Sequence, residues 1–102
     1  MVAVAGTDVQ MFSGGSGPPI LFLHGAGGNK GWQAFHQALA GNNTVYAPSQ
    51  PGFNGTESPD WVATINDVAH FNLQLVQQLG LDQYVLMGHS MGGWIAAEMA
   101  AM

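Results

Sequence analysis

The sequence predicts an α/β fold whose central sheet is mainly parallel and whose strands are connected by helices. Three short apolar runs indicate buried strands, at residues 20–23, 44–47 and 84–87. A segment with apolar residues at helical spacing follows each of these runs. Such an alternation of strand and helix is typical of parallel strands joined by right-handed crossover connections.

The segment before the first buried run predicts an antiparallel N-terminal hairpin or two edge strands. Residues 2–12 alternate loosely between apolar and polar, and a Gly-Thr-Asp turn signal lies at residues 6–8. Residues 13–19 contain three glycines and two prolines. Because proline cannot extend a strand ladder, we expect this stretch to be a turn or connector.

Three helices are expected after the buried strands. The first has apolar residues at helical spacing from Trp32 and is closed by Gly41. The second starts at a capping box on Thr64, with Asp in place of the usual Glu or Gln, and ends at Gly80. The third covers residues 90–102 and is rich in Ala and Met.

The last helical run has no Gly, Asn or Pro after it. Because a domain seldom ends inside a strong helix, we expect residues 1–102 to be a partial domain, the N-terminal portion of a longer protein. A complete small domain is the alternative.

Composition and charge argue against several classes of partner. The chain has one lysine, no arginine and a net charge of −5. One cation cannot neutralise a run of phosphates, so we expect no nucleic-acid partner, and a polybasic membrane patch is absent. The chain has no cysteine, and its His, Asp and Glu residues lack metal-ligand spacing, so we expect no metal and no cofactor. No secretory signal or spanning segment is evident, which favours a cytoplasmic location and makes the Asn-x-Thr triplets at Asn42 and Asn54 accidental.

The strongest motif is GHSMGG at residues 88–93, which fits G-x-S-x-G between an apolar strand and a helix. A sharp strand-to-helix turn would hold Ser90 in a strained backbone conformation and project its hydroxyl from the sheet. Side chains at positions 88 and 92 would collide in such a turn, which explains Gly88 and Gly92. The serine would lie at a helix N-terminus, where N–H groups stabilise negative charge. An ordinary capping serine is the alternative.

A second motif, HGAGG at residues 24–28, directly follows the first buried strand. Without side chains in the way, its backbone N–H groups can approach a reacting oxygen. A dinucleotide fingerprint would need a glycine where Lys30 stands, and a phosphate-binding P-loop would need Ser or Thr where Gly31 stands. Nucleotide binding is therefore not expected.

The motifs and their order resemble the N-terminal portion of the α/β-hydrolase fold superfamily, in its group of esterase, lipase and C–C-hydrolase-like enzymes. Residues 21–28, 47–58 and 79–93 carry the resemblance. It implies that Ser90 is a nucleophile and that the backbone N–H groups of Ala26 and Met91 form an oxyanion hole. It also implies that the nucleophile elbow includes Gly88, His89 and Gly92, and that the oxyanion loop includes His24, Gly25 and Gly27.

The implied function is that of a serine hydrolase that transfers the acyl group of an ester or related small-molecule carbonyl substrate to water. Epoxide hydrolases and haloalkane dehalogenases of this fold use a carboxylate nucleophile, which Ser90 does not supply. A perhydrolase stays open, and so does a non-catalytic relative that binds a ligand or partner. Ser49 stands where the family often has Asp, so the subfamily also stays open.

No acid or base partner of Ser90 is identified. In the family these residues follow the serine along the chain, but here only Glu98 and no histidine does. We expect His24 to hydrogen-bond its own loop, and His89 to point away from the serine. The chain alone should therefore be nearly inactive. The other two histidines are expected in helices, solvated or partly packed: His36 and His70.

Four large side chains are candidates for the wall of an acyl pocket, although residues of this kind at such spacing more often belong to a core: Trp32, Phe53, Trp61 and Met91. Glu98 is expected at the surface or behind the site.

Overall fold

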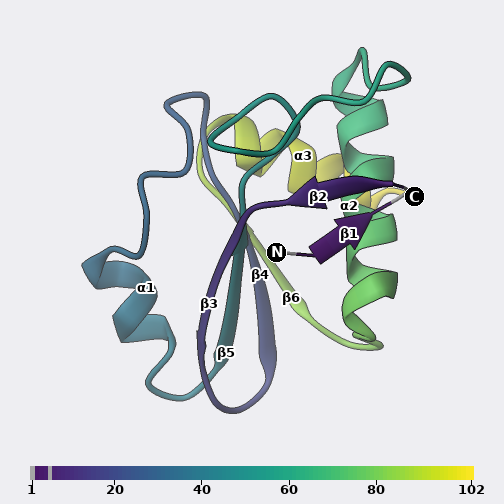
Figure 1. Ribbon diagram of the computed structural model, residues 1–102. Coiled ribbons are helices and arrows are strands. Elements are labelled where there is room, and N and C mark those ends of the chain that lie inside the picture. Colours follow the sequence, from purple (N-terminus) through teal and green to yellow (C-terminus); the bar gives the residue numbers. More distant parts are fainter. Residues whose placement is uncertain (1, 5) are drawn as a thin grey trace.

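The computed structural model describes residues 2–4 and 6–102, and its centre is a four-stranded mixed sheet (Figure 1). The strand order is β3-β5-β4-β6. Strand β4 runs parallel to both β5 and β6, whereas β3 pairs with β5 in the antiparallel sense. The parallel α/β sheet predicted from the sequence is confirmed. The strand bounds are β3 (Met11–Gly15), β4 (Pro19–Leu23), β5 (Thr44–Pro48) and β6 (Val85–Gly88).

The N-terminal strands β1 (Val2–Val4) and β2 (Thr7–Val9) form the expected antiparallel hairpin as a separate small sheet. Met1 and Ala5 lie outside the described residues. The connector predicted over residues 13–19 is shorter than expected at both ends, because β3 extends to Gly15 and β4 begins at Pro19. A Cβ added at Gly15 would lie 2.1 Å from the Asn43 carbonyl oxygen, so this glycine allows the end of β3 to approach the connection between α1 and β5 closely. Proline is tolerated as the first residue of a strand.

The helices are α1 (Ala34–Leu39), α2 (Ile65–Leu79) and α3 (Met91–Ala100). The capping box on Thr64 and the left-handed cap at Gly80 are both present. Trp32 precedes α1, so the sequence placed the start of this helix too early. Gly31, at φ 93°, lies outside the helical region, and the helix begins only after Gln33.

The main core lies between one face of the sheet and helices α2 and α3. Successive residues of a strand point to opposite faces, and β4 shows this directly. Leu21 and Leu23 are fully buried in the main core. Phe22 packs on Phe35 of α1 instead, with ring centroids 5.1 Å apart. Helix α1 therefore covers the face opposite to α2 and α3, which lie together on the other side of the sheet in Figure 1.

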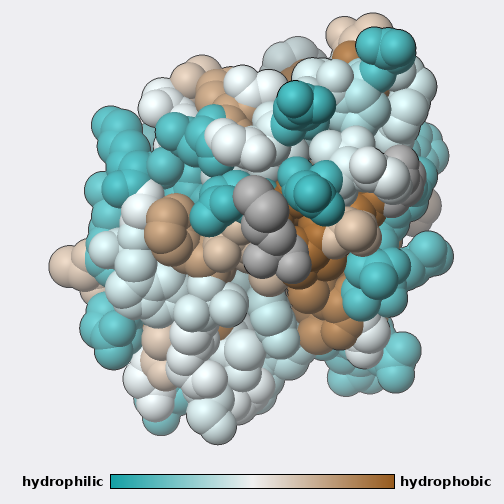
Figure 2. Space-filling view, viewed as in Figure 1, coloured by the Kyte–Doolittle hydropathy of each residue, from teal (hydrophilic) through white to brown (hydrophobic). Residues whose placement is uncertain are grey.

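The surface carries several large hydrophobic side chains. Strand β6 is an edge of the described sheet, and its Val85 is 54% exposed, similar to Trp94 on α3 at 59%. The face shown in Figure 2 has hydrophobic residues gathered right of its centre, with hydrophilic ones around them. Within residues 2–4 and 6–102, none of the helices has both the length and the apolar character needed to cross a membrane.

Candidate active site

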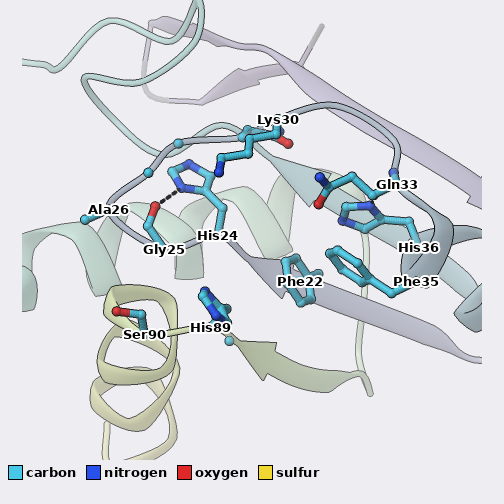
Figure 3. Close-up of a pocket in the computed structure, with 14 residues that line it drawn as sticks. Phe22, His24, Gly25, Ala26, Lys30, Gln33, Phe35, His36, His89 and Ser90 are labelled. Carbon is cyan, nitrogen blue, oxygen red and sulfur yellow. Dashed lines mark hydrogen bonds between the residues drawn. The ribbon is translucent and has the colours of Figure 1, made fainter.

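The two motifs meet because their strands are neighbours. Strands β4 and β6 are parallel, and Leu23 is paired with Gly88 in their register. The N–H of His89 donates to the Leu23 carbonyl over 3.1 Å. The segments that follow the two strands therefore leave the same edge of the sheet side by side (Figure 3).

Ser90 occupies a sharp turn between β6 and α3. Its backbone has φ 56° and ψ −115°, a conformation that costs a non-glycine residue about 1–3 kcal/mol. The residue is exposed, and its side chain makes no capping hydrogen bond to α3. Ser90 is therefore not an ordinary capping serine, and its hydroxyl is available at the helix N-terminus.

The glycines around Ser90 allow backbone contacts that no side chain would permit. A Cβ at Gly88 would lie 2.3 Å from the carbonyl group of Gly92. A Cβ at Gly92 would lie 1.9 Å from the Leu23 oxygen, at the end of β4. At Gly93 the nearest atom would be 3.6 Å away, an ordinary contact. The backbone at the start of α3 is thus pressed against β6 at Gly88 and against the end of β4 at Leu23, whereas the space beside Gly93 is open.

The loop after β4 lies against the serine. A Cβ at Gly25 would come within 3.3 Å of the Ser90 Cβ and 3.0 Å of the His89 ring nitrogen Nδ1. The N–H of Gly28 donates to the Gly25 carbonyl over 3.0 Å, which closes a turn and leaves the N–H of Ala26 outside that bond. Met91 is the first residue of α3, so its N–H has no acceptor within the helix. Both N–H groups thus belong to segments that flank Ser90.

His24 is buried and holds the start of this loop. The backbone N–H of Gln50 donates to His24 Nε2 over 2.9 Å, so the ring proton lies on Nδ1 and is donated to the Gly25 carbonyl at 2.7 Å. Burial lowers the pKa of His24, and the bond to Gly25 partly opposes this shift. The ring is therefore a neutral bridge with both nitrogens engaged.

Asn29 fastens the far end of the loop, a role that the sequence analysis missed. Its N–H donates to Asn54 Oδ1 over 2.6 Å. Its side-chain amide donates to the Ala47 carbonyl at 3.0 Å and to Ser49 Oγ at 3.2 Å. Asn54 itself has a positive φ of 38°. The Asn-Gly pair at residues 54–55 is a local turn signal, but nothing in the sequence links it to Asn29.

A second buried pair extends this support to α2. Gln50 donates from Nε2 to Asn72 Oδ1 over 3.1 Å, and Asn72 donates from Nδ2 to Gln50 Oε1 over 2.6 Å. Asn72 also donates to the Val68 carbonyl, one turn earlier in the helix. Since the N–H of Gln50 donates to the His24 ring, the paired side chains of Gln50 and Asn72 connect the start of the loop to α2.

A cavity of about 550 Å³ opens beside Ser90. Its aromatic lining is Phe22 and Phe35, and none of the four residues predicted for an acyl pocket is part of the described wall. Each of those packs elsewhere: Trp32 on His36, Phe53 on His24, Trp61 near Phe71, and Met91 against the main core. The lining residues are Phe22, His24, Gly25, Ala26, Gly27, Gly28, Asn29, Lys30, Gln33, Phe35, His36, Gly88, His89 and Ser90.

His36 is more deeply buried than the sequence suggested, at 3% exposure. Its ring lies 4.0 Å from that of Phe35 and stacks on Trp32 at 5.2 Å between centroids. The N–H of Gln33 donates to Nδ1 over 2.9 Å, so the proton is on Nε2, which has no partner among the described residues. Burial lowers the pKa of His36. The aromatic residues at 32, 35 and 36 were the one signal for this cluster.

The remaining titratable candidates lie at the surface or away from Ser90. His89 is exposed beside the serine, and His70 is exposed on α2. Glu98 accepts a long hydrogen bond of 3.5 Å from Asn66. Over the described ranges, no group of three or more His, Asp or Glu side chains is placed to hold a metal ion.

Comparisons with known proteins agree on one family. The family model described as "Alpha/beta hydrolase family" matches residues 20–102. The uncharacterized protein Rv2715 of Mycobacterium tuberculosis is 34% identical over 87 residues, which cover 84% of this chain and 26% of that protein. A crystal structure of a bacterial membrane phospholipase A matches with a TM-score of 0.90 and 32% identity, over 98% of this chain and 34% of the other.

Epoxide hydrolase VrEH1 from Vigna radiata matches with a TM-score of 0.87 and 27% identity, over 97% of this chain and 33% of the other. The chain therefore spans about a quarter of the length of this curated relative and about a third of each of these solved structures.

Proposed function

The chain belongs to the alpha/beta hydrolase family, and from this premise we propose that it supplies the nucleophile and the oxyanion hole of a serine hydrolase. The substrate would be a small-molecule ester or related carbonyl compound. The main support is Ser90 itself, which is exposed and has a strained backbone conformation at the N-terminus of α3. Its side chain makes no capping hydrogen bond there. It also lies against a glycine loop at the wall of a cavity.

In the proposed reaction, Ser90 Oγ attacks the carbonyl carbon and loses its proton to a base. The carbonyl oxygen becomes an oxyanion, which accepts hydrogen bonds from the N–H groups of Ala26 and Met91. Each such donor is worth about 3–4 kcal/mol of barrier in comparable sites. The leaving group departs with a proton, and water then releases the acyl group as an acid and restores Ser90.

None of the four histidines in this chain suits the role of base. Both nitrogens of His24 are engaged, and the proton-bearing Nε2 of His36 is buried among aromatic rings. His89 packs against Gly25, and His70 lies on α2. We propose that the base and its acid come from parts of the protein outside these 102 residues. A serine without its histidine typically loses a factor of about 10⁶ in kcat.

An epoxide hydrolase activity is the nearest rival, because such an enzyme shares the fold. The family's epoxide hydrolases attack through a carboxylate, and position 90 carries a hydroxyl instead. A non-catalytic relative is the other rival. Both rivals predict that Ser90 does not react with an electrophile designed for serine hydrolases.

The test is covalent labelling of the full-length protein with a fluorophosphonate probe. We expect one adduct, located on Ser90 by mass spectrometry, and no adduct in a Ser90→Ala variant. Ser16→Ala, an exposed serine between β3 and β4, is the matched control and should label like the wild type. Failure of a well-folded full-length protein to label would favour the non-catalytic alternative.

A further inference from the structure

The distribution of charge in this molecule singles out the cavity. The chain carries six acidic residues and one cation, Lys30, for a net charge of −5. Lys30 lines the cavity beside Ser90, and no acidic residue is part of its described wall. The single lysine of this chain thus lies where it can attract an anionic group into the cavity.

The position of the Lys30 side chain follows from the glycines beneath it. A Cβ at Gly27 would lie 3.6 Å from Lys30 Cε and 3.8 Å from Nζ, so the side chain folds back over the loop. Figure 3 shows it directed along the loop toward Ala26 and His24. Because two residues of chain span at most about 7 Å and each added Cβ lies about 1.5 Å from its own Cα, the ammonium lies within about 17 Å of the Ser90 Cβ.

The residues that line the cavity near Lys30 suit a substrate with a charged group and an apolar spacer. Gln33, which can donate through its amide, follows Lys30 on the same segment and also lines the cavity. Phe22 and Phe35 lie below them in Figure 3 and present apolar surface. The cavity thus joins an apolar wall to a cation, with the candidate nucleophile at the other end of the loop.

We propose that Lys30 selects substrates in which an anionic group, a carboxylate or a phosphate, is separated from the scissile carbonyl by an apolar spacer of several atoms. This inference rests on the proposed function, since it assigns a substrate class to the same site. Lys30 binds the anionic group and takes no part in the chemical step.

The test compares two esters in the full-length protein, p-nitrophenyl hydrogen suberate and its neutral methyl ester. In the wild type, we expect a higher kcat/KM for the anionic ester. Lys30→Met should lower the ratio of the two kcat/KM values about tenfold, whereas Lys30→Arg should keep it. Added salt should also lower this ratio in the wild type.

Asp82→Asn, an exposed residue outside the cavity, is the control for long-range charge and should leave the ratio unchanged. An equal loss on both esters in Lys30→Met, or no loss on either, would overturn the assignment.

A binding measurement separates this inference from the proposed function. Suberate should bind to the Ser90→Ala protein in calorimetric titration, and the double variant with Lys30→Met should bind it about tenfold more weakly. If suberate binding depends on Lys30 but neither ester is cleaved, the proposed hydrolase activity fails and the anion site stands. If both esters are cleaved but suberate binding ignores Lys30, the anion site is wrong.

Discussion

The two segments that form the candidate active site are held in different ways. The turn at residues 88–92 is held by direct backbone contact, with less than 2.5 Å available for a side chain at Gly88 and Gly92. The loop at residues 24–30 is held by hydrogen bonds of buried side chains, above all those of His24 and Asn29. The candidate nucleophile belongs to the first segment, and one of its two candidate oxyanion donors, the N–H of Ala26, belongs to the second.

The two segments should therefore differ in how well they tolerate substitution. A backbone contact at van der Waals limits cannot be adjusted, so an added methyl group must displace a strand or a helix. A hydrogen-bond network is graded, because each bond contributes about 0.5–1.5 kcal/mol and an orphaned buried partner costs about 1–3 kcal/mol. The serine therefore has a fixed position, whereas the position of the loop depends on several separate bonds.

The largest expected effect is at Gly92. Gly92→Ala should destabilise the protein by about 3 kcal/mol or more, because the new Cβ would come 1.9 Å from the Leu23 oxygen. Gly93→Ala is the matched control one residue later, where a Cβ makes only ordinary contact, and alanine in a helix should even be favourable by up to about 1 kcal/mol. Urea unfolding of the two variants measures the difference. Equal stabilities would mean that the turn is not held by backbone contact.

A smaller effect is expected at Asn29. Asn29→Ala should cost about 2 kcal/mol, because it removes two buried hydrogen bonds of the side-chain amide, to the Ala47 carbonyl and to Ser49 Oγ. The rate of Ser90 labelling by a fluorophosphonate should fall as well, since the loop carrying Ala26 loses its far anchor. Asn66→Ala, which removes an exposed 3.5 Å bond to Glu98, is the control and should change neither quantity. A normal labelling rate in Asn29→Ala would show that the loop holds its position without this anchor.

The turn could be predicted from the sequence because its causes are local. A run of apolar residues, a G-x-S-x-G pattern and a helical segment follow one another within residues 84–102, and each has its own signal. The capping box of α2 was predicted for the same reason. The strand β3 was missed in part because its glycines resemble a turn, whereas Gly14 makes room for the Trp32 ring and Gly15 for the backbone between α1 and β5.

The supports of the loop could not be predicted, because they join residues far apart in the chain. Asn29 and Asn54 are 25 positions apart, and Gln50 and Asn72 are 22 apart. An asparagine or glutamine is common at surfaces and in turns, so its type alone says nothing of a distant partner. The aromatic wall of the cavity was also misassigned, since Phe22 points away from the core only because of the alternation along β4.

The smallest expected effect is a pH dependence that belongs to the loop and not to the turn. The folded pKa of His24 lies below its ordinary value of 6.5, chiefly through burial, so the unfolded chain binds a proton more readily. Between the two values, the unfolded state holds more protons, and stability therefore rises with pH. The contribution of His24 is fully present above about pH 6.5 and is lost as the pH falls from there through the folded pKa.

Urea unfolding between pH 7.5 and pH 5 checks this prediction. His24→Gln should be less stable than the wild type at pH 7.5, because its loop bonds are lost, and its stability should fall less steeply on acidification. Burial also lowers the pKa of His36, so part of the fall in stability on acidification remains in that variant. His70→Gln removes an exposed imidazole on α2 and is the control for loss of a histidine away from the loop, with wild-type stability expected at pH 7.5. If His24→Gln retained the full acid slope, the neutral bridge at His24 would not be what holds the start of the loop.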